Sequence, residues 1–306
     1  MNDTLRSRLE ALNRGPLPAD ATAVEHAKQV IAAVKSDAPF RQPPKLPHPA
    51  APTASSPPAR RVGLLRRGEE IETPFGKHLR IDLPIDQLWH GGANLIAARQ
   101  AFLRRLADTA AAAIEPTVLL EREFAAFVQA LPDRTIALDL ETCGLAGSAL
   151  FLIGLLRQVD GQPIVQLLLA RNYAEEPAVL WSLWTIIGDH DVLLTFNGKS
   201  FDWPMVVERS IRHRLQVPAT RDLWTHIDIL HHARRRYKRQ LPNCRLQTLE
   251  RFVCRRTREG DIPGHAIPAA YANFVRTGFE REMDEILHHN ALDLVTLFDL
   301  AHRLAA

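Results

Sequence analysis

The chain has 306 residues, of which 46% are hydrophobic and 24% charged, the proportions of an ordinary globular protein. Its net charge is +3, and the sequence pI of about 8.9 is mildly basic. The three cysteines form no CxxC pair, so neither a disulfide framework nor a cysteine zinc site is expected. No apolar run is long enough to span a bilayer, and the N-terminus lacks an apolar signal core. We therefore expect a cytoplasmic, soluble protein that does not associate with membranes.

The first 60 residues predict a tail instead of a packed domain. Two short helical stripes, in residues 5–13 and 20–35, precede a segment with seven prolines between residues 43 and 58. Such a composition is typical of an extended linker. Residues 1–60 are thus predicted to be an N-terminal tail with short helices and a Pro-rich linker.

Residues 61–131 are predicted to form an N-terminal extension that packs on, or leads into, the domain that follows. Short strand-like segments separated by Gly and Pro occupy residues 61–95. Apolar periodicity then predicts two helices, over residues 94–114 and 118–131.

Residues 132–306 show a more regular order, with three strands followed by alternating strands and helices. The expected strands are 135–140, 149–157, 163–170, 191–196 and a short one ending at Asp228, and the expected helices are 176–188, 203–214, 229–239, 246–254, 268–277 and 281–303. This order predicts an α/β fold, a mixed β-sheet with an antiparallel part, flanked by helices.

Four acidic residues stand out by their positions in these elements. Asp139 and Glu141 are two residues apart on one strand, so both side chains point to the same face. Asp202 lies where a strand passes into a helix, and Asp293 lies in the last helix. Each acid alone has an ordinary explanation, such as a helix cap or an ion pair. Together, however, strand-end, loop and late-helix acids can converge at the carboxyl edge of an α/β sheet.

Converging carboxylates repel one another unless cations neutralise them. Oxygen ligands without nearby cysteine favour Mg²⁺ or Mn²⁺ over zinc. Two such ions, about 4 Å apart, are suited to phosphoryl transfer because they stabilise both the attacking and the leaving oxygen. The four acids therefore predict a site with two Mg²⁺ or Mn²⁺ ions.

Three motifs resemble those of the DEDD 3′→5′ exonucleases, which have a ribonuclease-H-like fold. They are "LDLETCGL", "TFNGKSFDWPMV" and "HHNALDLVTL", of which the second is especially similar to the exonuclease motif of family-B DNA polymerases. More narrowly, "ETPFG", "LPNCRLQTLER" and "REGDIPGHAIPAAY" are similar to segments of the bacterial YprB-like ribonuclease-H-like family, over roughly residues 62–303. The resemblance implies a DnaQ-like exonuclease in which Asp139, Glu141, Asp202 and Asp293 bind metal. It also implies that Asn197 steadies the second motif or touches substrate, although a simple Asn-Gly turn explains that residue equally well.

The general base that the resemblance implies on the last helix has two candidates. His288 lies five residues before Asp293, the usual spacing for a histidine base, and His289 lies four before it. Because each residue turns a helix by about 100°, His289 is about 40° from Asp293 and His288 about 140° away. We favour His289 and retain His288 as the alternative.

A basic segment between residues 234 and 258 contains ten Lys and Arg and one acid, Glu250. A solvated helix face is the usual explanation of such a run, but the imbalance favours contact with phosphates. The partner predicted is nucleic acid, single-stranded or with an accessible 3′ end, and the candidate contact residues are Asn197, Lys199, Phe201, Arg245 and Tyr237. A strand-end acid, Asp228, is a weaker candidate for a metal or substrate role.

Three functional hypotheses follow from these observations. The first is a metal-dependent 3′→5′ exonuclease that hydrolyses DNA or RNA with two metal ions. The second is a nucleic-acid-binding scaffold that keeps a ribonuclease-H-like fold with little turnover. The third, a domain for a small phosphorylated ligand, lacks any GxGxxG or P-loop sequence.

Overall fold

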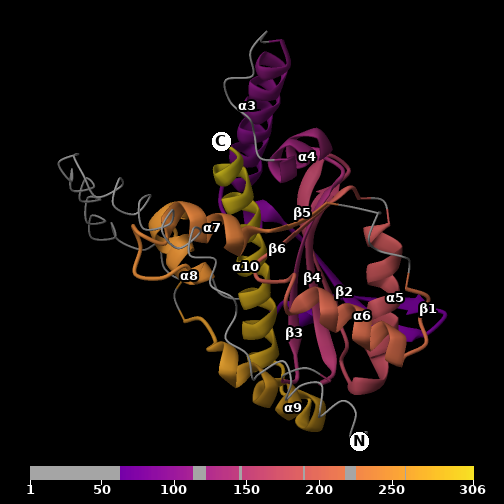
Figure 1. Ribbon diagram of the computed structural model, residues 1–306. Coiled ribbons are helices and arrows are strands. Elements are labelled where there is room, and N and C mark those ends of the chain that lie inside the picture. Colours follow the sequence, from indigo (N-terminus) through magenta and orange to yellow (C-terminus); the bar gives the residue numbers. More distant parts are fainter. Residues whose placement is uncertain (1–62, 113–121, 145–146, 189, 218–224, 259) are drawn as a thin grey trace, which may run out of the picture. The chain divides into compact units, whose positions relative to one another are not determined.

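The computed structural model describes residues 63–112, 122–144, 147–188, 190–217, 225–258 and 260–306. All of them belong to one compact unit, Arg60–Ala306, and the predicted tail of residues 1–60 lies outside the described residues. Within this unit one sheet has the strand order β1-β2-β5-β4-β3-β6-β7 (Figure 1). No helix in the described part of the chain is long and apolar enough to cross a membrane.

One half of the sheet is antiparallel. Strands β1 (Glu69–Thr73) and β2 (Gly76–Pro84) form a hairpin, and β2 pairs with β5 (Gln162–Leu169). Strand β5 pairs in turn with β4 (Leu150–Val159), and β4 with β3 (Thr135–Thr142). The predicted extension therefore contributes two strands to the same sheet as the domain that follows it.

The other half of the sheet is parallel. Strand β6 (Val192–Thr195) pairs with β3, and β7 (Thr225–Asp228) pairs with β6. The apolar strand residues are almost entirely buried, as expected for central strands that are covered on both faces.

Helices cover both faces of this sheet. Figure 1 shows α10 (Arg281–Ala305) along one face, and α5 (Glu176–Ile187) and α6 (Asp202–Arg212) on the other. The remaining helices are α3 (Gly92–Ala112), α4 (Arg122–Ala130), α7 (Ile229–Tyr237), α8 (Leu246–Leu249) and α9 (Ile267–Thr277). The mixed α/β fold predicted from the sequence is confirmed.

The last helix buries an apolar stripe: Ile286, Leu287, Leu294, Leu297 and Leu300 are each at most 1% exposed. Helix α10 contacts β3, β4, β5 and β6, so it forms the central support of one face of the sheet.

One helix differs from expectation. The segment 246–254 is α-helical only as far as Leu249 and continues as a π-helical turn, Glu250–Cys254. Arg255 then ends the turn with a φ of 58°, in the left-handed region. Wider turns of this kind are often found beside functional sites.

Candidate active site

The first two acids lie on the part of β3 that extends beyond its parallel neighbour. Strand β6 pairs only with Thr135–Ala137, so Asp139 and Glu141 follow the end of that pairing. The strand is fully buried up to Leu138 and half-buried from Asp139 onward. A rigid central strand thus holds two carboxylates at the carboxyl edge of the parallel strands, where ligand sites of α/β sheets are found.

The third acid, Asp202, begins helix α6 directly after the loop that follows β6. Its carboxylate accepts hydrogen bonds from its own backbone amide and from that of Leu140, which lies between the first two acids. These bonds bring the start of α6 to the end of β3.

The loop before Asp202 is held by a different acid. The Asp228 carboxylate accepts hydrogen bonds from the backbone amides of Asn197 (2.8 Å) and Lys199 (3.2 Å), and it caps α7 through the amide of Leu230 (3.1 Å). Asn197 has a φ of 69°, a conformation that asparagine tolerates better than most residues. Asp228 is 1% exposed, so its contacts are those of a structural residue that shapes the loop.

The fourth acid, Asp293, projects from α10 between two basic side chains. Its Oδ1 lies 2.5 Å from Arg258 Nη2, and its Oδ2 lies 3.5 Å from His289 Nε2. The other ring nitrogen of His289, Nδ1, lies 2.7 Å from Asp261 Oδ1. Of the two adjacent histidines, it is His289 whose ring lies against Asp293, while His288 is half-buried.

A buried amide joins α10 to β3. Asn290 Nδ2 donates a 2.8 Å hydrogen bond to Asp139 Oδ2, and Asn290 is fully buried. The side chain fits because Gly154 lies opposite Asp139 on β4, and a Cβ at that position would overlap Asn290 Oδ1. A glycine on one strand therefore makes room for the residue that contacts the acid on the next.

The acids at the end of β3 are electrostatically unfavourable in the ionised form. Burial, together with Asp293, Glu141 and Asp202, raises the pKa of Asp139 well above its ordinary value. Burial is also the main cause that raises the pKa of Glu141 to about 8 and that of Asp202 to about 7. No ion pair links Asp139, Glu141 or Asp202 to a Lys or Arg among residues 63–306 that the structure describes. The charge of Arg258 lowers the pKa of Asp139 and that of His289 lowers the pKa of Glu141, but neither offsets the effect of burial.

The histidine responds to the same charges in the opposite direction. Burial alone would lower the pKa of His289, but its hydrogen bond to Asp261 and the charges of Asp293 and Glu141 raise it above the ordinary histidine value. The ring therefore lies in a strongly negative field.

The donor set fits a hard divalent cation in its chemistry, although the side chains are not closed into a metal site. Among the described residues, no three His, Cys, Asp or Glu side chains are grouped so that they could hold an ion. The available donors are carboxylate oxygens, which Mg²⁺ and Mn²⁺ prefer, and burial raises the pKa of Glu141 and of Asp202. Asp139, Glu141, Asp202 and Asp293 are the residues that would supply the ligands.

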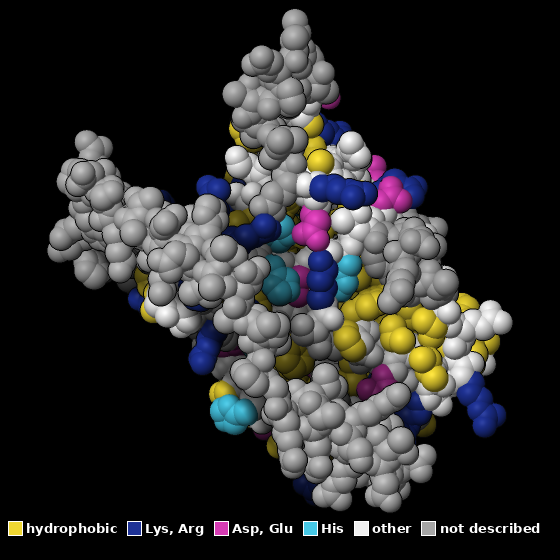
Figure 2. Space-filling view, in the orientation of Figure 1, with side chains coloured by type: hydrophobic (Ala, Val, Ile, Leu, Met, Phe, Trp, Pro, Cys, Tyr) yellow, Lys and Arg dark blue, Asp and Glu magenta, His cyan; other side chains and the backbone are white. Residues whose placement is uncertain are grey.

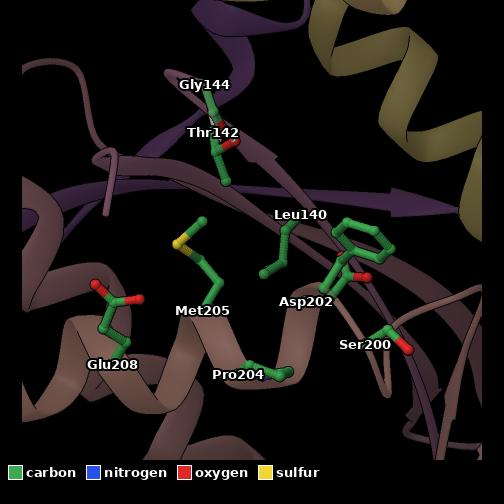
Figure 3. A pocket seen from close by; sticks show the side chains of 9 residues that line it. Leu140, Thr142, Gly144, Ser200, Asp202, Pro204, Met205 and Glu208 are labelled. Atoms are coloured by element: carbon green, nitrogen blue, oxygen red, sulfur yellow. Dashed lines mark hydrogen bonds between the residues drawn. The ribbon is translucent and has the colours of Figure 1, made fainter. Parts of the chain in front are cut away.

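A pocket of about 390 Å³ adjoins Asp202. Figure 3 shows that α6 forms one wall and the end of β3 another. Phe201 at its rim is 63% exposed, although it is a large aromatic side chain. The residues that line the pocket are Leu140, Thr142, Gly144, Ser200, Phe201, Asp202, Pro204, Met205 and Glu208. An apolar concave surface therefore lies directly beside one of the four acids.

The residues predicted to contact nucleic acid are in varied environments. Asn197 is half-buried in its loop, and Lys199 is exposed with its Nζ 3.1 Å from Glu123 Oε1. Arg245 is exposed at the start of α8, whereas Tyr237 is half-buried and packs against the core.

The basic segment divides into an outward and an inward part. Arg256 and Arg258 turn toward buried acids: Arg256 Nη1 lies 3.2 Å from Asp299 Oδ2, and Arg258 Nε donates to Glu250 Oε2 at 2.6 Å. The exposed members are Arg234, Arg235, Arg236, Lys238, Arg239, Arg245, Arg251 and Arg255. Figure 2 shows basic, acidic and histidine side chains in the middle of one face, with a hydrophobic patch beside them.

Four residues in contact with the site were not singled out by sequence reasoning: Asn290, Gly154, Arg258 and Asp261. Two sequence segments could have indicated three of them. Asn290 directly follows His289 in "HHNALD", and Arg258 and Asp261 both lie in "REGDIPG". A motif comparison marks such segments without saying what their side chains contact.

The sequence profile of the RNase H superfamily matches residues 136–305, from the start of β3 to the end of α10. The chain belongs to the RNase H superfamily. Within that superfamily it is 33% identical over 165 residues to the uncharacterized protein YprB of Bacillus subtilis (strain 168), a match that covers 53% of this chain and 40% of that protein. This finding confirms the YprB-like resemblance.

One solved structure is also similar to the present chain. It is the family B DNA polymerase from the hyperthermophilic archaeon Pyrobaculum calidifontis, with 16% sequence identity and a TM-score of 0.47. The match covers 56% of this chain and 24% of the polymerase chain. The chain thus matches less than half the length of either relative.

Proposed function

We propose that this protein is a divalent-metal-dependent nuclease of the cytoplasm, and more narrowly a 3′→5′ exonuclease that releases nucleoside 5′-monophosphates. One observation carries the proposal: three half-buried acids, none of them ion-paired to a Lys or Arg of the described segments, lie beside Asp293 and His289. Membership of the RNase H superfamily supports the coarser statement, a nuclease-type enzyme. Two Mg²⁺ or Mn²⁺ ions held by the four acids would supply the positive charge that stabilises a pentavalent phosphorus centre.

His289 is the general base of the proposed reaction. As a water oxygen bonds to phosphorus, Nε2 of His289 accepts the proton of that water. The bond between phosphorus and the 3′ oxygen of the preceding nucleotide breaks, and that oxygen takes a proton from solvent. The products are a nucleoside 5′-monophosphate and a strand shortened by one nucleotide.

The apolar pocket beside Asp202 supports an exonuclease in particular. Its volume of about 390 Å³ is in the range of small-ligand sites. The exposed ring of Phe201 offers a surface on which a terminal base stacks, a contact that every base can make.

The decisive experiment incubates the protein with 3′-labelled single-stranded RNA and DNA in Mg²⁺, Mn²⁺ or EDTA. We expect metal-dependent shortening that Asp139→Ala abolishes while the variant remains folded by circular dichroism. Asp191→Ala is the matched control, because this surface acid pairs with Arg134 and lies outside the four-acid set. His289→Ala should lower the rate far more than His288→Ala, and the reverse result would overturn the choice of base.

A nucleic-acid-binding scaffold with little turnover is the second candidate. The observation that favours it is that both carboxylate oxygens of Asp293 already face basic side chains, Arg258 and His289, instead of an open metal position. Nucleic-acid binding by the wild type without shortening of any substrate would establish this alternative.

The proposed partner is nucleic acid that is single-stranded or has an accessible 3′ end. The exposed arginines of the basic segment are its proposed phosphate contacts, with Asn197, Lys199, Phe201 and Tyr237 as further candidates. Arg245→Gln should reduce the slope of log K against log salt by about 0.7 if its guanidinium contacts one phosphate. Arg66→Gln, at an exposed arginine paired with Glu280, is the control and should leave the slope unchanged. A wild-type affinity that does not depend on salt would exclude a phosphate track.

A further inference from the structure

Asp261 contacts the proposed base from the side away from the acid cluster. The His289 Nδ1 atom lies 2.7 Å from Asp261 Oδ1, and an ionised carboxylate only accepts hydrogen bonds, so Nδ1 carries the proton of this bond. The opposite nitrogen, Nε2, then faces Asp293 Oδ2 at 3.5 Å. A single hydrogen bond therefore fixes both the plane of the ring and the nitrogen that faces the site.

Asp261 is itself held by residues other than the histidine. Its Oδ2 accepts a 2.9 Å hydrogen bond from Gln247 Nε2 and lies 3.5 Å from Arg258 Nη1. Arg258 is anchored in turn by Glu250, the first residue of the π-helical turn. Because these supports do not involve His289, they hold the carboxylate in place independently of the ring.

Helix α10 restricts the position of His289 from the backbone side. His289 is 9% exposed and lies on the central helix α10, whose neighbouring residues are packed against the sheet. A ring that is fixed at its backbone by α10 and at Nδ1 by Asp261 has one remaining direction for Nε2, toward Asp293. Groups placed in this way are pre-organised for proton transfer.

We propose that Asp261 is the positioning residue of His289: it holds the Nδ1 proton so that Nε2 is the atom that accepts the proton of the attacking water. This inference rests on the proposed nuclease function. When Nε2 takes up the proton, the Asp261 carboxylate stays ionised and stabilises the imidazolium through the hydrogen bond that it already makes. An ordinary structural ion pair would instead stabilise the fold without acting through His289.

A double-mutant cycle on the full chain separates these two roles. We expect Asp261→Asn to lower kcat about 10- to 100-fold, with KM and the Mg²⁺ affinity from titration calorimetry unchanged. In a His289→Ala background the same substitution should have almost no further effect on kcat, since the ring that Asp261 positions is gone. Asp191→Asn, the same chemical change at a surface acid, is the matched control.

A spectroscopic measurement reads the hydrogen bond without any reaction. Nitrogen-15 NMR of the histidine side chains should show a protected Nδ1–H signal in the wild type that is absent from His289→Gln and lost in Asp261→Ala. If Asp261→Asn does not fold, Gln247→Ala replaces it, because it removes a support of Asp261 without touching the ring. Its smaller loss of kcat should also vanish in the His289→Ala background.

The possible failures are distinguishable. If the wild type cleaves nucleic acid and Asp261→Asn has a kcat within twofold of it, the positioning role is wrong and the proposed function stands. A loss of kcat that persists undiminished in the His289→Ala background also overturns the inference, because Asp261 would then act through another group. If the wild type cleaves no substrate with either metal, the proposed function fails and the positioning role fails with it.

Discussion

Two regions of this protein bury carboxylates in opposite ways. On one side of the sheet Glu176, 1% exposed, is surrounded by donors: Arg209 makes two hydrogen bonds to it at 2.6 and 2.5 Å, His213 lies at 2.8 Å, and the amide of Leu150 donates at 2.8 Å. At the end of β3, Asp139 receives one amide hydrogen bond and has three acids as neighbours.

The two regions also differ in the direction of their pKa shifts. Burial alone would raise the pKa of Glu176, but Arg209, Leu150 and His213 bring it below its ordinary value. Burial and neighbouring acids raise the pKa of Glu141 to about 8. Removing a buried acid that has its own cation leaves that cation unpaired and is costly, whereas a buried acid without one costs stability itself and is retained where function requires it.

The largest effect is expected at the compensated acid. Glu176→Gln leaves the buried Arg209 without its counter-charge, and we expect the free energy of unfolding to fall by about 3–5 kcal/mol in urea titrations. Its neighbour Glu175 makes a more exposed pair with Arg171, so Glu175→Gln should cost about 1 kcal/mol or less. Equal losses in the two variants would contradict the comparison.

His302 is a buried titratable residue outside the candidate site. It tests whether a buried group that lacks an opposite charge is always part of a functional site. This residue is 1% exposed between Phe127 and Phe298, its Nε2 has no hydrogen-bond partner in the described part of the chain, and burial lowers its pKa to about 4. Burial therefore favours the neutral ring at neutral pH. The unfolded chain therefore binds more protons between pH 6.5 and 4, and stability that is fully present above pH 6.5 is lost as the pH falls through this window.

From the size of that shift, the loss on acidification is on the order of 3 kcal/mol. His302→Leu should flatten this part of the profile of unfolding free energy against pH while leaving the proposed nuclease activity unchanged. A variant whose stability falls as steeply as that of the wild type below pH 6.5 would show that His302 is not the group responsible.

Gly154 links the sheet to the site through packing. A Cβ in Gly154→Ala would overlap Asn290 Oδ1, so Asn290 must shift and its hydrogen bond to Asp139 must weaken. We expect a loss of about 1–3 kcal/mol in unfolding free energy together with a lower cleavage rate. Gly264→Ala is the control, since a Cβ there meets nothing within 4 Å. Full stability and full activity of Gly154→Ala would show that Asn290 has room to move.

The smallest expected effect is a gain in stability instead of a loss. Asp202→Asn removes a buried carboxylate whose pKa is raised to about 7, so the metal-free protein should gain about 1 kcal/mol in thermal denaturation. The stabilisation that Mg²⁺ gives the wild type should shrink in the same variant. Asp191→Asn, at an exposed acid, should change neither quantity. A destabilised Asp202→Asn would mean that this acid belongs with Glu176 and not with Asp139.

Secondary structure that short stretches of chain decide could be predicted from the sequence. Apolar runs predicted β3, β4 and β5, and the helical stripe of residues 281–303 corresponds to α10 within two residues at its end. The direction of the basic side chains could not be predicted in the same way. Nothing in the sequence distinguishes the ten basic residues of the segment, yet Arg256 and Arg258 turn inward to Asp299 and Glu250.

The sequence by itself determined the α/β fold and the superfamily, because periodicity and motifs are written in the order of the residues, and it proposed four acids for the candidate site. Only the tertiary structure decided which groups meet. Asn290 reaches Asp139 across 151 residues, and Asp261 reaches His289 across 28. Such contacts depend on how α10 packs on the sheet, and packing depends on the whole core at once. The same dependence separates Glu176, which makes an ion pair with Arg209, from the acids of β3, for which the described residues provide no such pair.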